Sequence, residues 1–369
     1  GKMSFPRVVY FYKNFGGLQS RLGLAVRGGV VQPEPANLEI VVPKGDTPLI
    51  VSPGVILTGD YDLRSVAAPL PVGSITTSPT GTLIIAEDNR TTVSGGAVPP
   101  DGYIFKMVES ATIQNLRIQG PMPGFQDYNF DRNLCGGIVA INDPGTGIVR
   151  IRNCEIYNFS YAGIFVNQDC DEVNINNCQI HHIKGEGGYT TAKGYGIWIK
   201  GKLVDDTSTD ATLINIEDCI FDECKSALDF DPDLKDVTIQ NNTFGNIFFE
   251  ETVNCHANEL IYPHPGLIGS SCSYYAGCAT LPCAGIFNIT GISTGNFTIN
   301  NSIFYQKIRN GTNISQINLP YSFNHLLTGS APKVYTIDVS ENTFAVGKDA
   351  PGAYSSLTLC NRGGYFKLA

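Results

Sequence analysis

Short runs of alternating apolar and polar residues recur along the chain, each followed by Asn or Asp, a small residue, and then Ile or Phe. This alternation predicts β-strands with one apolar and one polar face. Between the copies lies a second run that begins with Gly or Ala, as in AGIFVN, YGIWIKG and ALDFD. The clearest copies are ATIQNLRI, VRIRNCEI, VNINNCQI, INIEDCIF, VTIQNNTF, FTINNSIF and IDVSENTF, which begin at Ala111, Val149, Val173, Ile214, Val237, Phe297 and Ile337.

The spacing of the copies predicts a solenoid. The shortest spacing, from Val149 to Val173, is 24 residues, and repeats of this length stack so that each coil covers the apolar face of the next. Equivalent residues then lie about 4.8 Å apart along the stack. We therefore expect Cys154, Cys178 and Cys219 to form a ladder of buried free thiols, and the repeated Asn residues to occupy turns and bond their own backbone; these are Asn153, Asn177, Asn241 and Asn301.

With this repeat, the chain resembles the right-handed parallel β-helix family, which includes pectate lyases and other polysaccharide-processing enzymes. The resemblance covers Leu49 to Val346 and depends on the N-N-x-x-F/I repeats and the YGIWIKG run. It implies an all-β solenoid with inserted loops and a polysaccharide partner. We assign residues 1–48 to an N-terminal cap or extension, 49–346 to the parallel β-helix and 347–369 to a C-terminal cap or tail.

Net charge and cysteine content narrow the possible partners and the cellular location of the protein. The formal charge of −9 disfavours a nucleic-acid partner, and no apolar run has the length of a membrane span. There are 11 cysteines, four of which lie in a stretch rich in Gly, Ser and Pro and are expected to form disulfides: Cys255, Cys272, Cys278 and Cys283. Glycosylation triplets, for example at Asn288 and Asn310, agree with a secreted or cell-surface glycoprotein.

The first candidate site lies on the strands Tyr195–Lys200 and Ala227–Asp231. Strict alternation sends Trp198 and Lys200 outward on the first strand, and Asp229 and Asp231 outward on the second. The two Asp Cα atoms are about 6.6 Å apart, close to the separation that an inverting glycosidase needs, and Trp198 can stack on a sugar ring. A calcium site that includes Asp233 and Asp236, or an inert surface, is the alternative.

A second cluster lies in the loop HHIKGEGGYTTAKGYG. A β-elimination lyase needs a base and a cation, and Lys184, Lys193, Lys200 or a histidine, His181 or His182, could supply these roles. Glu186, Tyr189 and Lys193 of this loop are candidate substrate-binding residues.

A third cluster precedes the expected strand Leu260–Tyr262, which we predict to stack next to Asp229–Asp231. Glu259 and His256 would then project beside the aspartates, as a catalytic and a substrate-binding residue. The alternative is a disulfide-pinned lid.

These observations favour a secreted protein that binds and cleaves a polysaccharide, with hydrolysis slightly ahead of lyase elimination. No cofactor is required, and calcium is left open. A non-catalytic fibre, adhesin or spike subunit is the competing class, and self-assembly agrees with it because solenoids also form rigid rods.

Overall fold

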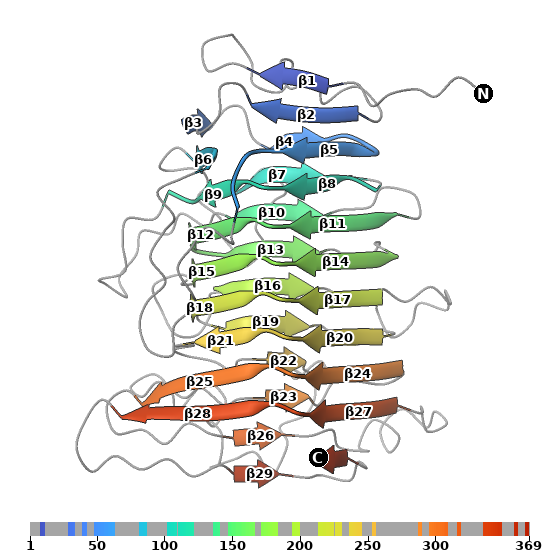
Figure 1. Ribbon diagram of the computed structural model, residues 1–369, viewed down its shortest axis with the longest axis vertical. Coiled ribbons are helices and arrows are strands. Elements are labelled where there is room, and N and C mark those ends of the chain that lie inside the picture. Colours follow the sequence, from blue (N-terminus) through green and yellow to red (C-terminus); the bar gives the residue numbers. More distant parts are fainter. Residues whose placement is uncertain are drawn as a thin grey trace.

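The computed structural model describes residues 8–11, 29–33, 39–42, 48–62, 81–86, 102–108, 110–121, 136–140, 147–166, 171–183, 194–199, 213–224, 226–230, 236–245, 253–255, 287–289, 295–308, 316–318, 335–348, 358–360 and 366–368. The regular elements in these segments are β-strands in three parallel sheets, and successive coils stack along one axis (Figure 1). The fold is therefore a parallel β-helix solenoid, as the repeat predicts. In the described part of the chain, no helix is long and apolar enough to cross a membrane.

Each central coil contributes one strand to sheet C, then one to sheet A and one to sheet B. Sheet A contains β1 (Val8–Phe11), β2 (Gly29–Pro33), β5 (Val55–Thr58), β8 (Thr112–Gln114), β11 (Ile148–Arg152), β14 (Glu172–Asn176), β17 (Leu213–Glu217), β20 (Asp236–Gln240), β24 (Gly295–Asn300), β27 (Tyr335–Ser340) and β30 (Phe366–Leu368). Sheet B contains β3 (Glu39–Val42), β6 (Leu83–Ala86), β9 (Arg117–Gln119), β12 (Glu155–Phe159), β15 (Gln179–Ile183), β18 (Ile220–Cys224), β21 (Thr243–Gly245), β25 (Ile303–Ile308) and β28 (Thr343–Lys348).

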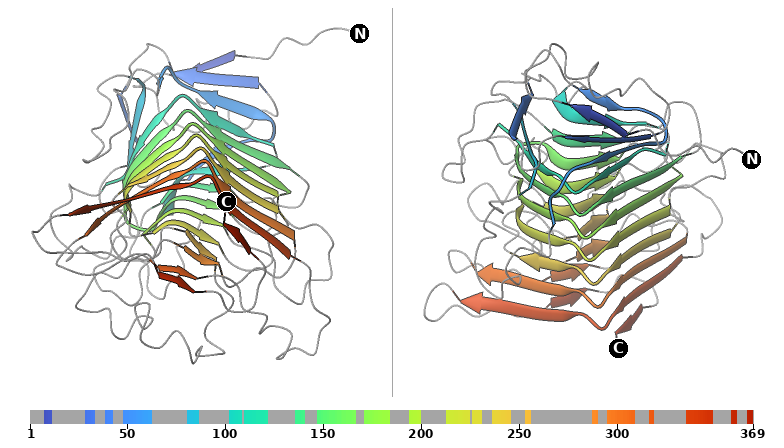
Figure 2. Two further views of the ribbon diagram at one scale, coloured as in Figure 1. Left: turned by 60° about the horizontal axis from the view of Figure 1, so that its bottom comes forward. Right: turned by 45° about the horizontal axis from the view of Figure 1, so that its top comes forward.

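Sheet C contains β4 (Leu49–Val51), β7 (Tyr103–Met107), β10 (Gly136–Ala140), β13 (Ala162–Val166), β16 (Tyr195–Ile199), β19 (Ser226–Phe230), β22 (Val253–Cys255), β23 (Phe287–Ile289), β26 (Gln316–Asn318) and β29 (Thr358–Cys360). Figure 2 shows how the chain bends between two sheets at the same place in successive coils.

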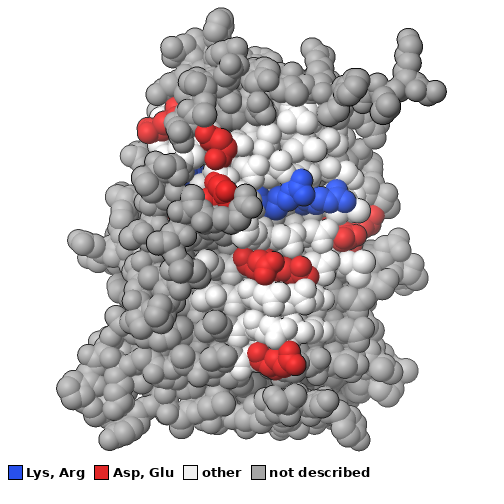
Figure 3. Space-filling view, viewed as in Figure 1, with Lys and Arg blue, Asp and Glu red and all other residues white. Residues whose placement is uncertain are grey.

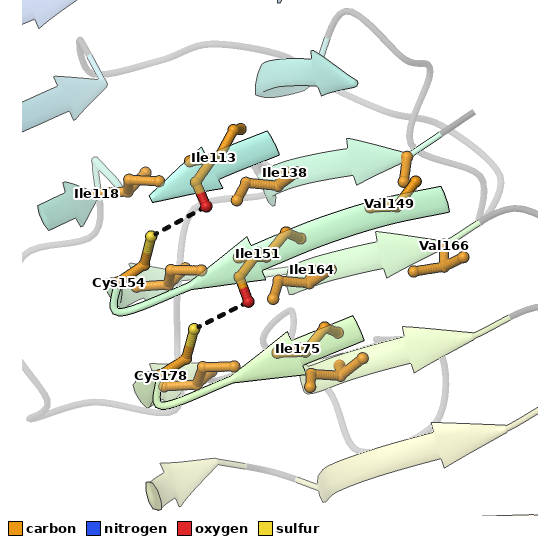
Figure 4. Close-up of a cluster of buried hydrophobic side chains, with 14 of the residues drawn as sticks. Ile113, Ile118, Ile138, Val149, Ile151, Cys154, Ile164, Val166, Ile175 and Cys178 are labelled. Carbon is orange, nitrogen blue, oxygen red and sulfur yellow. Dashed lines mark hydrogen bonds between the residues drawn. The ribbon is translucent and has the colours of Figure 1, made fainter. Parts of the chain in front are cut away.

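The core is a set of apolar columns that run along the stack. In sheet B, Ile156 pairs with Ile180, which pairs with Phe221 on the next coil, and all three are buried. Phe221 stacks on Phe244 with ring centroids 5.0 Å apart. Figure 4 shows the same stacking of Ile, Val and Cys side chains between the sheets. Because every coil presents the same inward positions, this one core is continuous along the described coils.

The turn between sheets A and B is made by the repeated Asn residues. Asn115, Asn153 and Asn177 have φ values of 56°, 52° and 51°, the left-handed conformation that Asn tolerates better than most residues. Their side chains bond from coil to coil, because the amide of Asn153 donates to Asn115 Oδ1 and that of Asn177 to Asn153 Oδ1. The predicted turn role is confirmed, and in this ladder the bonding partners are neighbouring coils rather than each residue's own backbone.

The cysteine ladder follows directly after this turn. Cys154, Cys178 and Cys219 are buried free thiols, as predicted. Each thiol donates to the carbonyl of the preceding coil: Ile113 for Cys154, Ile151 for Cys178 and Ile175 for Cys219. Figure 4 shows the first two of these bonds. Burial raises the pKa of the Cys154 and Cys178 thiols well above the ordinary value, so these groups are structural.

Two expectations about strand order need correction. The strand that follows Ser226–Phe230 in sheet C is Val253–Cys255, whereas we predicted Leu260–Tyr262 there. A three-residue strand in a polar sequence has no clear alternation, which explains the error. In addition, β1, β2 and β3 pair with the sheets, so the ladder extends into residues 1–48, although the boundaries of the cap stay predictions.

Candidate functional site

Polar side chains occupy two adjacent columns on the outer side of sheet B. Arg117, Glu155 and Gln179 hold one position on successive coils, each two residues after the Asn turn. All three are buried. Buried charged groups are rare unless they are paired, so the partners of these side chains indicate what the cluster is for.

The second column contains Gln119, Tyr157, His181 and Asp222. The rings of Tyr157 and His181 stack with centroids 5.0 Å apart and planes 6° from parallel. The Tyr157 hydroxyl donates to Gln119 Oε1 at 2.7 Å. Desolvation by burial, followed by the charge of Glu155, raises the pKa of Tyr157 to about 12. Tyr157 therefore stays neutral through physiological pH and holds the His181 ring in one plane.

A chain of polar contacts links four residues across three coils. Arg117 Nε donates to Glu155 Oε2 at 3.1 Å, and His181 Nε2 lies 3.1 Å from Glu155 Oε1. The other ring nitrogen of His181, Nδ1, lies 2.7 Å from His182 Nδ1. We call this cluster of Arg117, Glu155, His181 and His182 the histidine relay. It resembles a catalytic dyad in form, with a carboxylate that orients one imidazole and a second imidazole at the end.

The relay constrains where the protons are. The Glu155 carboxylate accepts from Arg117, so its other oxygen accepts from His181 Nε2–H. In the tautomer whose proton is on His181 Nε2, the Nδ1 atom has a lone pair and can accept from His182 Nδ1–H. The basic lone pair of His182 is then on Nε2. An imidazole whose tautomer is set by a hydrogen-bond partner in this way is suited to accept a proton.

His182 owes its position to an unusual backbone. It has φ of 55° inside a strand, and the same conformation is found at Asn158 on the preceding coil, with φ of 63°. The pairs on either side, Tyr157 with His181 and Phe159 with Ile183, remain in register. Each coil has one left-handed residue between the same two pairs, so the chain turns at the same place on both coils and the strands stay in register. His182 is half-buried and directly precedes the loop in which Lys184 was predicted to act.

On sheet C, the alternation predicted for Trp198 and Asp229 is correct. The two residues are paired neighbours on β16 and β19, while Ile197, Leu228 and Phe230 are in the core. Trp198 stacks on Phe165 of β13 with ring centroids 4.2 Å apart, and it packs against a small cluster around Tyr103 and Tyr161. Asp229 is only 1% exposed. Its catalytic role stays a prediction, and a substrate would first need access to it.

The side chains of the other predicted site residues are not described in the structure. Cys255 is described only as a residue of β22. The remainder lie outside the described residues: Asp231, Glu259, Lys184, Lys200, Glu186, Tyr189, Lys193, His256, Cys272, Cys278 and Cys283. Sequence reasoning missed Arg117 and Glu155. The sequence does contain a signal for them, a polar residue that recurs two places after the turn in N-L-R, N-C-E and N-C-Q. An amphipathic strand does not require a charged residue at this position, so a charge there indicates a specific partner.

Metal binding was left open by the sequence. Among the described residues, no group of three or more His, Cys, Asp or Glu side chains is placed to hold an ion. Asp231 and Asp233 lie outside those residues, and only the backbone of Asp236 is described, so the calcium hypothesis stays a prediction.

Comparison with known proteins assigns no family and no activity to the chain. No family model matches the sequence, and no curated protein is significantly similar to it. Three solved structures are similar over most of the chain. The first is an alginate lyase from Paenibacillus sp. str. FPU-7, with a TM-score of 0.46 and 13% identity over 97% of this chain and 98% of that one.

The second is the surface protein and adhesin PfbA of Streptococcus pneumoniae, with a TM-score of 0.32 and 12% identity over 95% of this chain and 94% of that one. The third is the A-module of the mannuronan C-5 epimerase AlgE6 of Azotobacter vinelandii, with a TM-score of 0.23 and 13% identity over the same shares, 95% and 94%. The three parallel sheets confirm the parallel β-helix fold expected from the repeat. Such low similarity transfers no residue and no activity.

Proposed function

We propose that this protein is a carbohydrate-active β-helix that cleaves a uronate-containing polysaccharide by β-elimination, with His182 as the base. The observation that carries the proposal is the 2.7 Å contact between His181 Nδ1 and His182 Nδ1, at the end of a relay that begins at Arg117 and Glu155. The 11 cysteines and the glycosylation triplets support action outside the cell or at its surface.

The chemistry requires a base beside the acidic C–H of a uronate. His182 Nε2 takes the C5 proton, the electrons of that bond form the C4–C5 double bond, the C4–O4 bond breaks and O4 takes up a proton. The positive charge that develops on His182 spreads to the relay, because the Nδ1 proton of His182 can shift toward His181 Nδ1 while Glu155 keeps its contacts with His181 Nε2 and Arg117. Lys184, two residues after His182 and one of the candidates named from the sequence, would neutralise the uronate carboxylate.

Hydrolysis at Asp229 is the second candidate, supported by its place beside Trp198 in the register of sheet C. It ranks lower because Asp229 is buried. The two mechanisms leave different products. Elimination creates an unsaturated, ultraviolet-absorbing sugar end, while hydrolysis creates a reducing end without that absorbance.

The test compares wild type with His182→Asn on a panel of uronate polymers, with both products measured. Asn holds the equivalent left-handed position at Asn158, so the backbone conformation is retained while the base is removed. We expect the wild-type absorbance signal to fall by about 10²-fold or more in the variant. Reducing ends without absorbance, lost in Asp229→Asn but not in His182→Asn, would favour hydrolysis. The absence of both signals on every uronate polymer of the panel would contradict elimination.

A further inference from the structure

The outer face of sheet A is regular and charged. Its outward positions on the central coils form rows along the stack, and Figure 3 shows basic and acidic patches on the same face of the molecule. Several side chains bond within a row: Arg152 Nε donates to Gln114, and Asn215 donates to Asn174. These contacts hold the polar groups in place and leave a flat surface.

The charges on this face are separated by strand. Arg150 and Arg152 lie on β11, while Glu217 lies on β17, two coils further along. Arg150 and Arg152 form no ion pair with any described residue, and Arg152 is exposed. Glu217 accepts a hydrogen bond from the neutral amide of Gln240. Strands β11 and β17 therefore each carry a charge without an ion-pair partner among the described residues, which a complementary surface could satisfy.

The outward residues are arranged nearly symmetrically about β14. One coil from β14, Ile148, Arg150 and Arg152 of β11 correspond to Leu213, Asn215 and Glu217 of β17. Two coils away, β8 and β20 have the same two residue types in the same order, Thr112 and Gln114 on one side and Thr238 and Gln240 on the other, with Thr112 buried. This pattern suits a surface that pairs with itself after a two-fold rotation.

We propose that sheet A binds a second copy of this chain, in a dimer whose two-fold axis runs along β14 between the facing sheets. The rotation keeps the strand direction and reverses the solenoid axis. It places Arg152 opposite Glu217 of the other copy, twice, and Ile148 opposite Leu213. Face-to-face sheets with nearly aligned strands are an ordinary packing mode, with about 10 Å between them. This inference does not depend on the proposed enzymatic activity.

The expected contact is modest. Strands of five residues over seven coils, from β5 to β24, cover about 17 Å by about 29 Å, or about 1,000 Å² in total for both partners. This is at the lower limit for a specific interface, and its complementarity is polar. We therefore expect a weak dimer that dissociates when salt is added, because exposed ion pairs are screened.

Sedimentation velocity of the full chain at low salt tests the proposal. We expect Arg152→Glu alone and Glu217→Arg alone to raise the dimer dissociation constant by about tenfold or more, because each brings like charges together twice. An equimolar mixture of the two variants should form a heterodimer as tight as wild type, since both facing pairs then have opposite charge. Glu172→Gln should tighten the dimer, because Glu172 lies on the β14 row and opposes its own copy.

Lys106→Glu is the matched control, since it makes the same charge change on sheet C, and it should leave the dissociation constant unchanged. Unchanged circular dichroism melting curves show that each variant is folded. A wild type that is monomeric at low salt and high concentration overturns the proposal, as does a mixture that fails to restore the dimer. A monomer whose binding to an anionic polysaccharide is lost in Arg152→Glu also overturns it, in favour of a saccharide as the occupant.

Discussion

Arg117 Nε lies 3.1 Å from Glu155 Oε2, in a pair whose carboxylate is fully buried. Removing the carboxylate leaves the Arg117 charge and the His181 Nε2 hydrogen without their acceptor. We expect Glu155→Ala to lower the free energy of unfolding by about 3–5 kcal/mol, the usual cost of breaking a buried pair from one side. Urea unfolding followed by circular dichroism measures this.

The control replaces the three buried residues of the relay and leaves His182 in place. Arg117→Met/Glu155→Leu/His181→Phe removes all three polar groups at once, and Phe can keep the stacking on Tyr157. Such replacements are often neutral or stabilising, so the triple variant should be more stable than Glu155→Ala. If the triple variant is less stable than Glu155→Ala, the polar contacts of the relay stabilise the fold by more than the cost of desolvating their charged groups.

The repeat made most of this fold predictable, because strand position, inward direction and the Asn turn each follow from a local pattern. The same pattern placed Trp198 and Asp229 as neighbours on the outer side. The relay was harder to predict, since Glu155 and His181 are on different coils and meet only through the register of sheet B. The two histidines had been singled out from the sequence, but Arg117 and Glu155 had not. The burial of Asp229 was also unpredictable, since alternation tells which face of the strand a side chain is on but not whether other residues cover that face.

The buried thiols should be chemically silent in the folded protein. Burial raises the pKa of Cys154 and Cys178 well above the ordinary value, so almost none of either thiol is present as the reactive thiolate at neutral pH. We expect no alkylation of either residue by iodoacetamide under native conditions and complete alkylation in denaturant, read out peptide by peptide with mass spectrometry. Native labelling of Cys178 at the rate of a free thiol would show that the ladder opens.

Alkaline pH should destabilise the fold through Tyr157. Its pKa is raised from 10.0 to about 12, so the folded state keeps a proton that the unfolded state has lost between these two values. Where the unfolded state binds fewer protons, stability falls as pH rises. The contribution is fully present below pH 10.0 and lost progressively up to about pH 12.

The comparison is with Tyr157→Phe. This variant loses the hydrogen bond to Gln119, worth about 1 kcal/mol at neutral pH, but it should lose less stability than wild type between pH 10.0 and about pH 12. The melting temperatures of wild type and Tyr157→Phe should therefore converge as the pH is raised from 10.0 to about 12. Parallel curves for the two proteins would mean that Tyr157 titrates alike in both states.

A column of glycines in sheet C sets how closely the coils approach. A Cβ on Gly163 would lie 2.8 Å from the Gly196 carbonyl oxygen, and one on Gly196 would lie 2.6 Å from the Ala227 carbonyl oxygen. Both contacts are with backbone, which cannot move without disturbing the paired strands. We expect Gly163→Ala to cost about 1–3 kcal/mol, the usual penalty of overpacking, measured by urea unfolding. Thr238→Ala, on the half-exposed face of sheet A, should change stability by no more than about 0.5 kcal/mol. Equal effects of the two substitutions would mean that the coils can separate at Gly163 without cost. The continuous core argues against this, because a Cβ on Gly163 would also lie 3.1 Å from Ile180 Cγ2, so that a shift of the coils would displace Ile180 as well.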